Sequence, residues 1–269
     1  MNRYTITDEY EKIKSSMNTT TLSKRAKEKL LVLDDIVKKP FVLACTDGYT
    51  RFFSIMYTTG IVACFVAAIC LSPIFASEYT TKTDQLILSS RNGKKSLILA
   101  KLFTGLTLSG GICSSLTILT YFECMMVFGV DGANTPIQLY LPLSTYPLTM
   151  LQMAVIFSLC ILFANLLMSS IALLLSAKLK TPFGVIIIMS ILTIAPMFMN
   201  ASESNAVQHN MLALLPTNMM GLWMVTSPFL FEVFGCVLQP YIFMPMFAGI
   251  VTVFLMPFSY RMFKNHQIQ

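Results

Sequence analysis

Residues 51–78 read RFFSIMYTTGIVACFVAAICLSPIFASE, and this stretch decides the class of fold. Between Arg51 and Glu78 it holds no charged residue, which leaves an uncharged run at 52–77. About 20 residues of α-helix cross the ~30 Å of hydrocarbon in a bilayer. Because a segment in hydrocarbon must satisfy its own backbone hydrogen bonds, the run predicts a transmembrane α-helix. Pro73, close to its end, predicts a kink.

The same pattern recurs along the chain. The predicted spans are residues 52–77, 102–122, 148–177, 181–202 and 233–260. The 269 residues are 55% hydrophobic and 12% charged, whereas a soluble domain usually carries about 25% charged residues. The sequence therefore predicts an all-α, polytopic membrane helical bundle with five spans. A polar segment, residues 1–51, precedes this single transmembrane domain in the lipid bilayer.

One uncharged segment is ambiguous. Residues 210–231, NMLALLPTNMMGLWMVTSPFLF, are interrupted by Pro216, Gly221 and Pro228. We interpret the segment as re-entrant or interfacial, with Trp223 near the headgroups, where Trp is favoured. The competing interpretation is a sixth full span, which would invert the side on which everything before it lies.

The basic residues alternate between the loops that join the predicted spans. Three clusters hold them, namely Lys82, Arg91, Lys94, Lys95 and Lys101, then Lys178 and Lys180, then Arg261 and Lys264. The intervening loops, 123–146 and 200–239, hold none. Because basic loops stay in the cytoplasm, five spans predict a multi-pass plasma-membrane protein with a cytoplasmic C-terminus. The net charge of +6 thus indicates topology, and we expect no nucleic-acid partner.

The N-terminal segment departs from this charge pattern. It is predicted to lie outside, yet residues 1–50 hold nine basic and seven acidic residues. A segment of about 50 residues is near the length at which the charge rule loses force. The other explanation, which we favour, is that this chain lacks a first span that would deliver the segment across the membrane.

Part of that segment has helical periodicity. After Ser23, a suitable N-cap, apolar residues recur at helical spacing until Pro40. These apolar residues are Ala26, Leu30, Leu33 and Val37. The pattern predicts an amphipathic helix that lies on the membrane or on the protein's own loops. A contact with substrate or partner is the sharper alternative.

The connector between the first two spans predicts more structure than a loop requires. Ser77 or Thr80 can cap a helix that has Glu78 near its positive end, and Asn92-Gly93 is a helix stop. A short helix is therefore expected to lie flat at the cytoplasmic face. A basic loop that only fixes topology would not need the acidic residues Glu78 and Asp84.

Residues 77–101, SEYTTKTDQLILSSRNGKKSLILAK, resemble the cytoplasmic connector of permease subunits of type-2 ABC exporters. In that family an acidic residue ends a span, an apolar segment and a basic-Gly-Lys turn follow, and a Lys opens the next span. The matching residues are Glu78, Tyr79, Thr83, Asp84, Leu86, Ile87, Leu88, Ser89, Gly93, Lys94 and Lys101. The family commonly has Gly before the Thr, where this chain has Lys82. The LLPTNMMGLW segment at 214–223 is also similar.

The resemblance implies a function and its partners. A separate cytoplasmic ATP-binding subunit would hydrolyse ATP and push on the connector helix, and the spans would export a peptide, drug-like or lipid-like substrate. Two permease chains, identical or different, would assemble with two ATPase chains. The residues expected to couple to the ATPase subunit are Glu78, Tyr79, Thr83, Asp84, Leu86, Ile87 and Arg91. Such permeases usually have six spans, so the resemblance also implies the missing first span.

Polar residues inside predicted spans are candidates for a translocation path or gate, because they are costly in hydrocarbon. Glu123, near the outer end of the second span, lies at the headgroup interface or acts at an external gate. Gln152 and Asn165, in the third span, are expected to hydrogen-bond to neighbouring helices. A role facing the substrate is the alternative for both.

Other classes of function have weaker support in the sequence. We expect no catalytic site, metal or cofactor, because His209 and His266 lack ligand spacing and no G-x-x-x-x-G-K-[ST] phosphate loop is present. The seven cysteines form no C-x-x-C pair and are interpreted as apolar packing residues. A secondary, ion-coupled transporter would need ionisable groups near the midplane. A non-transporting immunity or assembly protein on the same scaffold is a further alternative.

Overall fold

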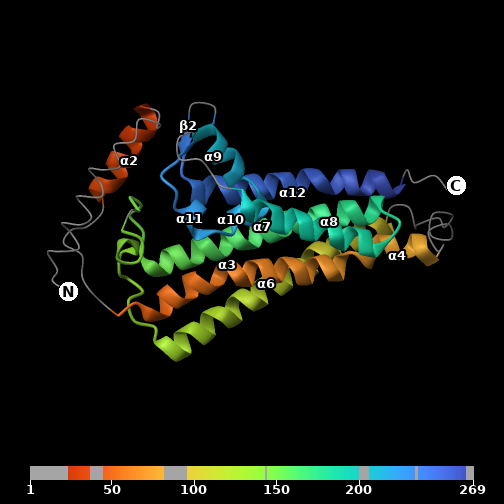
Figure 1. Ribbon diagram of the computed structural model, residues 1–269, viewed down its shortest axis with the longest axis horizontal. Helices are drawn as coiled ribbons and strands as arrows, with labels where there is room; N and C mark the ends of the chain where they lie inside the picture. Colours follow the sequence, from red (N-terminus) through yellow and green to blue (C-terminus); the bar gives the residue numbers. More distant parts are fainter. Residues whose placement is uncertain are drawn as a thin grey trace.

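The fold is an all-α helical bundle, seen in a computed structural model that describes residues 24–36, 45–81, 96–142, 144–199, 206–233 and 236–264. Among the helices in these residues, four are long and apolar enough to cross a membrane: Asp47–Glu78, Ile98–Phe128, Met150–Lys178 and Pro240–Phe263. They run together along the long axis of the molecule (Figure 1). These helices indicate a membrane-embedded protein, as the sequence predicts.

The first two spans are longer than predicted. The first consists of α3 (Asp47–Leu71) and α4 (Pro73–Thr81), separated at Ser72, and the second is α6 (Ile98–Phe128). The predicted bounds, 52–77 and 102–122, stopped at charged residues. An α-helix continues through such residues because its backbone bonds do not depend on the side chain being apolar. Charge therefore marks the end of an apolar run and not the end of the helix.

The third span, α7 (Met150–Lys178), is the central helix of the bundle. It packs against α3, α6 and α12 (Pro240–Lys264), and most of its side chains are buried. Gly105 of α6 allows one of these close approaches, because a Cβ atom there would lie 2.9 Å from the Leu173 side chain. A side chain at position 105 would therefore require the Leu173 side chain to move.

The predicted fourth span, residues 181–202, is shorter in the structure. It consists of α8 (Pro182–Ile194) and the 3₁₀ helix η3 (Ala195–Phe198). Together, Pro182–Phe198 form an apolar helix that is shorter than the four long ones. Pro196 cannot donate a backbone hydrogen bond, which accounts for the end of the α-helix just before it. The number of predicted spans was therefore one more than the number of long helices in the described residues.

The ambiguous segment 210–231 is not one continuous helix. Residues 206–225 form three short helices, α9 (Ala206–Ala213), α10 (Pro216–Met219) and α11 (Leu222–Val225), with breaks before Pro216 and at Gly221. This arrangement contradicts the alternative of a sixth full span. It agrees with an interrupted segment, whose position relative to a bilayer stays a prediction.

The predicted start of the last span, at residue 233, was wrong. Residues 231–238 contain a small antiparallel pair, β1 (Phe231–Val233) and β2 (Cys236–Leu238), and α12 begins only at Pro240. Apolar residues suit a strand as well as a membrane helix, so hydropathy alone could not separate the two. Proline is favoured in the first turn of a helix, which suits Pro240 to that position.

The predicted amphipathic helix is α2 (Lys24–Ile36), and it packs on the protein's own loops. Ala26 and Leu30 are buried in a small apolar cluster with Tyr146 and Leu230, and the Lys29 ammonium group donates to the Val237 carbonyl. Figure 1 shows α2 beside β2, at the end of the bundle opposite α4. We call these two ends the α2 end and the α4 end.

Basic residues of three spans gather at the α4 end. Lys101 lies in the first turns of α6, Lys178 in the last turn of α7, Lys180 just beyond it, and Arg261 in the last turns of α12. The loop 129–149 and the β1–β2 pair lie at the opposite end. The basic loops that follow the first span therefore meet at the α4 end, whereas the α2 end carries the basic residues of α2 and Arg51 in the first turns of α3.

Candidate functional site

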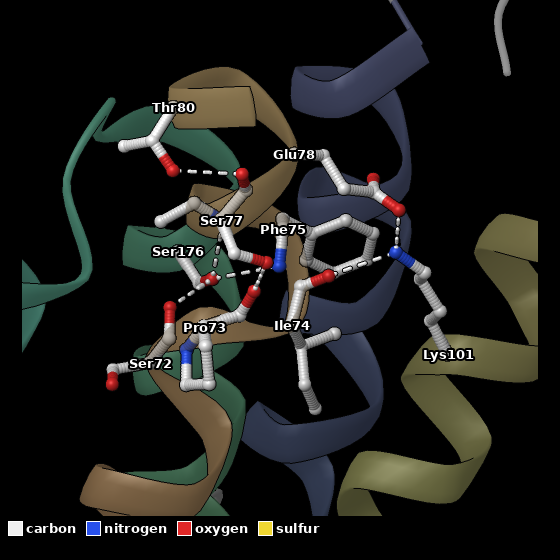
Figure 2. Close-up of polar contacts among 10 residues, drawn as sticks. Ser72, Pro73, Ile74, Phe75, Ser77, Glu78, Thr80, Lys101 and Ser176 are labelled. Carbon is white, nitrogen blue, oxygen red and sulfur yellow. Dashed lines mark hydrogen bonds and ion pairs between the residues drawn. The ribbon is translucent and has the colours of Figure 1, made fainter. Parts of the chain in front are cut away.

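The α4 end contains the polar contacts that join the predicted connector to the bundle (Figure 2). Its central feature is the break between α3 and α4. Pro73 has no N–H, so the Ile69 carbonyl one turn earlier lacks its usual helical donor. The Ser72 hydroxyl donates to that carbonyl at 3.0 Å instead. The kink predicted from Pro73 is therefore present, and a neighbouring side chain satisfies one of the backbone groups that it exposes.

A second serine, from α7, enters the same break. The Ser176 hydroxyl donates to the Ser72 carbonyl at 2.8 Å. It also accepts from the backbone N–H groups of Phe75, at 3.1 Å, and Ala76, at 3.2 Å. In an unbroken helix the Phe75 N–H would donate to residue 71. All of these groups are buried, so Ser176 replaces water as the partner of the interrupted backbone.

Lys101 holds α4 from the opposite side. Its ammonium group donates to the Ile74 carbonyl at 2.8 Å and forms an ion pair with Glu78. It also lies 5.3 Å from the centre of the Phe75 ring, within the range of a cation–π contact. The side chains are largely buried, with 22% of Lys101 and 12% of Glu78 exposed. Figure 2 shows Lys101 extending from α6 to Ile74 and Glu78 of α4.

An aromatic contact joins α4 to the end of α12. The Phe75 and Phe263 rings are both buried, with their centres 4.8 Å apart. Together with Ser176 and Lys101, this contact connects α4 to α6, α7 and α12. A displacement of α4 would therefore act on three of the four long apolar helices in the described part of the chain.

Most of the residues predicted to couple to the ATPase subunit lie outside the residues that the structure describes. Glu78 is the member of that set whose side chain the structure describes, in the ion pair above. Tyr79 belongs to α4, with only its backbone described. The others, Thr83, Asp84, Leu86, Ile87 and Arg91, lie outside the described residues. Their predicted role thus rests on the sequence.

Asn165 lies in the interior of the bundle and away from the α4 end. Its side-chain amide donates to the Ile161 carbonyl in α7 at 3.1 Å and to the Gly60 carbonyl of α3 at 3.3 Å. The sulfur of Met220, next to α10, is 4.0 Å away. The Asn165 carbonyl oxygen is buried and has no hydrogen-bond partner among the described residues. Asn165 therefore links α7 to a neighbouring helix, as the sequence led us to expect.

The other two candidate path residues are exposed at the α2 end. Glu123 lies in the last turns of α6 and not in a loop. Gln152 does not bond to a neighbouring helix. Its side chain accepts from the Thr149 backbone at 3.0 Å, and Thr149 accepts from the Gln152 backbone at 3.3 Å. This reciprocal pair is a capping box, so Gln152 helps to cap the N-terminus of its own helix. The structure does not bring Glu123, Gln152 and Asn165 together.

Sequence reasoning missed a buried polar cluster at the α2 end. The Tyr146 hydroxyl donates to the Ser227 carbonyl at 2.6 Å, and the Ser227 hydroxyl lies 2.9 Å from Nε2 of His209. Gln138 donates to the Tyr146 carbonyl at 2.7 Å. Burial, and to a lesser degree the nearby Tyr241, raises the pKa of Tyr146, so its hydroxyl stays protonated and donates. These residues are far apart in the sequence, and no spacing pattern relates them.

The contacts described at the α4 end join helices through hydrogen bonds and an ion pair. Among the described residues, no group of three or more His, Cys, Asp or Glu is arranged to hold a metal ion. Comparison with protein-family models, with curated proteins and with solved structures found no match. The function is therefore argued from the residues and contacts of this chain.

Proposed function

We propose that the chain is the membrane permease subunit of an ABC exporter, driven by a separate ATP-binding subunit. The observation that carries the proposal is the Glu78–Lys101 ion pair. These residues are the first and last matches to the type-2 exporter connector in the sequence. The ion pair brings the two ends of the connector together on the bundle, as a docking element for a partner would require.

The basic residues at the α4 end support a cytoplasmic position for the connector. Lys101, Lys178, Lys180 and Arg261 gather there, and basic loops stay on the cytoplasmic side. ATP and ATP-binding subunits are cytoplasmic, so the connector would face the partner. The exported substrate would be a peptide, drug-like or lipid-like molecule, since the helices are mostly apolar.

The proposed permease has five spans, of which α8 with η3 is the fourth in the sequence. Residues 182–198 would extend about 26 Å at ~1.5 Å per residue, compared with ~30 Å of hydrocarbon. A local thinning of the bilayer accommodates a difference of a few ångströms at modest cost. With five spans the C-terminus is cytoplasmic, in agreement with the distribution of bases, and a second permease chain would complete the transporter.

The test is assembly with an ATP-binding subunit encoded beside this chain. We expect the two proteins to co-purify from membranes and the complex to hydrolyse ATP. Asp84→Lys should abolish co-purification, because it reverses a charge in the proposed docking helix. Asp131→Lys makes the same change at an exposed position of the α2 end and should leave association intact.

Two results would contradict the proposal. One is association and ATP hydrolysis that Asp84→Lys leaves at the level of the Asp131→Lys control. The other is transport by the purified chain alone, in vesicles with an ion gradient and without any ATP-binding subunit. The second result would favour a secondary transporter.

A further inference from the structure

We propose that Ser176 is a positioning residue that makes the break between α3 and α4 a hinge coupled to α7. The inference rests on the proposed function for its biological purpose, while its physical basis is the hydrogen bonding at the break. In this view, a displacement of the connector moves α4, and the Ser176 hydroxyl transmits that displacement to the central helix of the bundle.

The first argument concerns the hydrogen-bonding capacity of the hydroxyl. A serine hydroxyl donates one hydrogen bond and accepts two. Ser176 uses all three, with the Ser72 carbonyl as acceptor and the Phe75 and Ala76 N–H groups as donors. Ser176 and Phe75 are fully buried, so water does not compete for these groups. One side chain thereby satisfies three backbone groups of another helix.

The second argument is that local side chains satisfy only some of the backbone groups at the break. Ser72 satisfies the Ile69 carbonyl within three residues of sequence. The Ser77 hydroxyl likewise donates to the Pro73 carbonyl. The Ser72 carbonyl and the N–H groups of Phe75 and Ala76 instead bond to Ser176, about 100 residues further along the chain. If the break served only to bend the helix, a local partner would suffice. Because the partner is on α7, the bend cannot change without breaking the contact between α4 and α7.

The third argument concerns what α7 touches. Ser176 lies in the last turn of the helix that packs against α3, α6 and α12. Through Asn165 the same helix is bonded to Gly60 in α3. A displacement that reaches Ser176 therefore reaches the interior of the bundle. The Lys101 contacts move α6 in parallel, from the other side of α4.

The experiment measures the distance between α4 and α7 by pulsed electron paramagnetic resonance on the purified chain in lipid nanodiscs. Nitroxide labels are placed at two exposed positions, Thr80→Cys and Lys178→Cys, in a variant without other cysteines. With Ser176 present, we expect a narrow distance distribution. In Ser176→Ala the distance distribution should broaden. The backbone groups at the break then lack their hydrogen-bond partner, and α4 can move independently of α7.

Two controls keep the test specific. Ser170 is also fully buried in α7, but its hydroxyl bonds to the Leu167 carbonyl of its own helix at 2.7 Å. Ser170→Ala should therefore keep the narrow distribution. Pro73→Ala restores a backbone donor, so a regular helix can satisfy its own groups. The narrow distribution should therefore return in the combination of Pro73→Ala with Ser176→Ala.

The proposal is overturned if Ser176→Ala and Ser170→Ala give the same distribution, or if Pro73→Ala fails to restore the narrow one. Neither outcome depends on an ATPase, so this test and that of the proposed function fail separately. In a complex with an ATP-binding subunit, Ser176→Ala should still hydrolyse ATP but lose transport per ATP hydrolysed. Retention of full transport would likewise overturn the proposed coupling.

Discussion

At the scale of single residues, Lys101 combines two kinds of contact with α4. Its ammonium group satisfies the Ile74 carbonyl, a backbone group, and neutralises Glu78, a side chain. A lysine is well suited to this because its ammonium group has three donors. A charge in apolar surroundings is stable only when paired, so each partner here depends on the other.

Replacement of Lys101 by Met should destabilise the protein through the charge that it leaves behind. The largely buried Glu78 carboxylate would then lose the Lys101 ammonium group as a partner. Breaking a buried pair in this way costs roughly 3–5 kcal/mol, and partial exposure of this pair reduces the expected cost to about 2 kcal/mol. The measurement is thermal unfolding of the purified protein in detergent.

The combination of Lys101→Met with Glu78→Gln provides the control for this prediction. Removal of both charges should recover part of the lost stability, because no unpaired charge is left in the site. If the double variant is less stable than Lys101→Met alone, the ion pair is not the source of the loss.

At the scale of secondary-structure elements, α2 shows how a short amphipathic helix is held. Thirteen residues are marginal as an isolated helix in water. Its buried Ala26 and Leu30 pack against Tyr146 and Leu230, which come from two different loops. The helix is therefore stabilised by its contacts with the α2 end, and it should detach if those contacts are lost.

Leu30→Glu should release α2 from the bundle. Burial of a leucine contributes about 1.5–3 kcal/mol, and a glutamate at this position would lose that contribution and bury a charge. We expect trypsin to cleave the variant near Arg25 and Lys29 faster than the unmodified protein, as measured by mass spectrometry. Val32 is 60% exposed in the same helix, so Val32→Glu should leave the cleavage rate unchanged. Equal rates for the two variants would contradict the packing of α2.

At the scale of the whole molecule, the two ends of the bundle differ in the elements that cover them. The α4 end carries basic residues from three spans, while the α2 end is covered by α2, the 129–149 loop and the β1–β2 pair (Figure 1). In the proposed topology, the bases of the α4 end lie on the cytoplasmic side. The two ends should therefore be reached by reagents from opposite sides of the membrane.

Cysteine labelling tests this orientation. Cys45 and Cys236 are exposed at the α2 end, and variants that retain one of them should react with a membrane-impermeant maleimide on intact cells. Lys180→Cys, in a variant without other cysteines, should react only after the membrane is permeabilised. Reaction of all three positions from the same side would exclude the proposed topology.

Much of the fold follows from local properties of the sequence. The four long helices overlap four of the five predicted spans, because hydropathy over about 20 residues is a sum that needs no tertiary contact. The kink at Pro73 was also predictable, since it follows from the missing N–H of one residue. The start of α12 was not, because the uncharged residues 233–238 suit a strand as well as a helix.

The sequence by itself determined that the chain is helical and membrane-embedded and that the first long helix is interrupted at Pro73. It also determined that Glu78 and Lys101 lie at the two ends of an unusual connector. Only the tertiary structure decided that these two residues pair, that Gln152 caps its own helix, and that Ser176 fills the break beside Ser72. Hydropathy, proline geometry and loop charge act within a few residues of the chain. A hydrogen bond between residues about 100 positions apart exists only once helix packing brings them within 3 Å, and no local pattern encodes that distance.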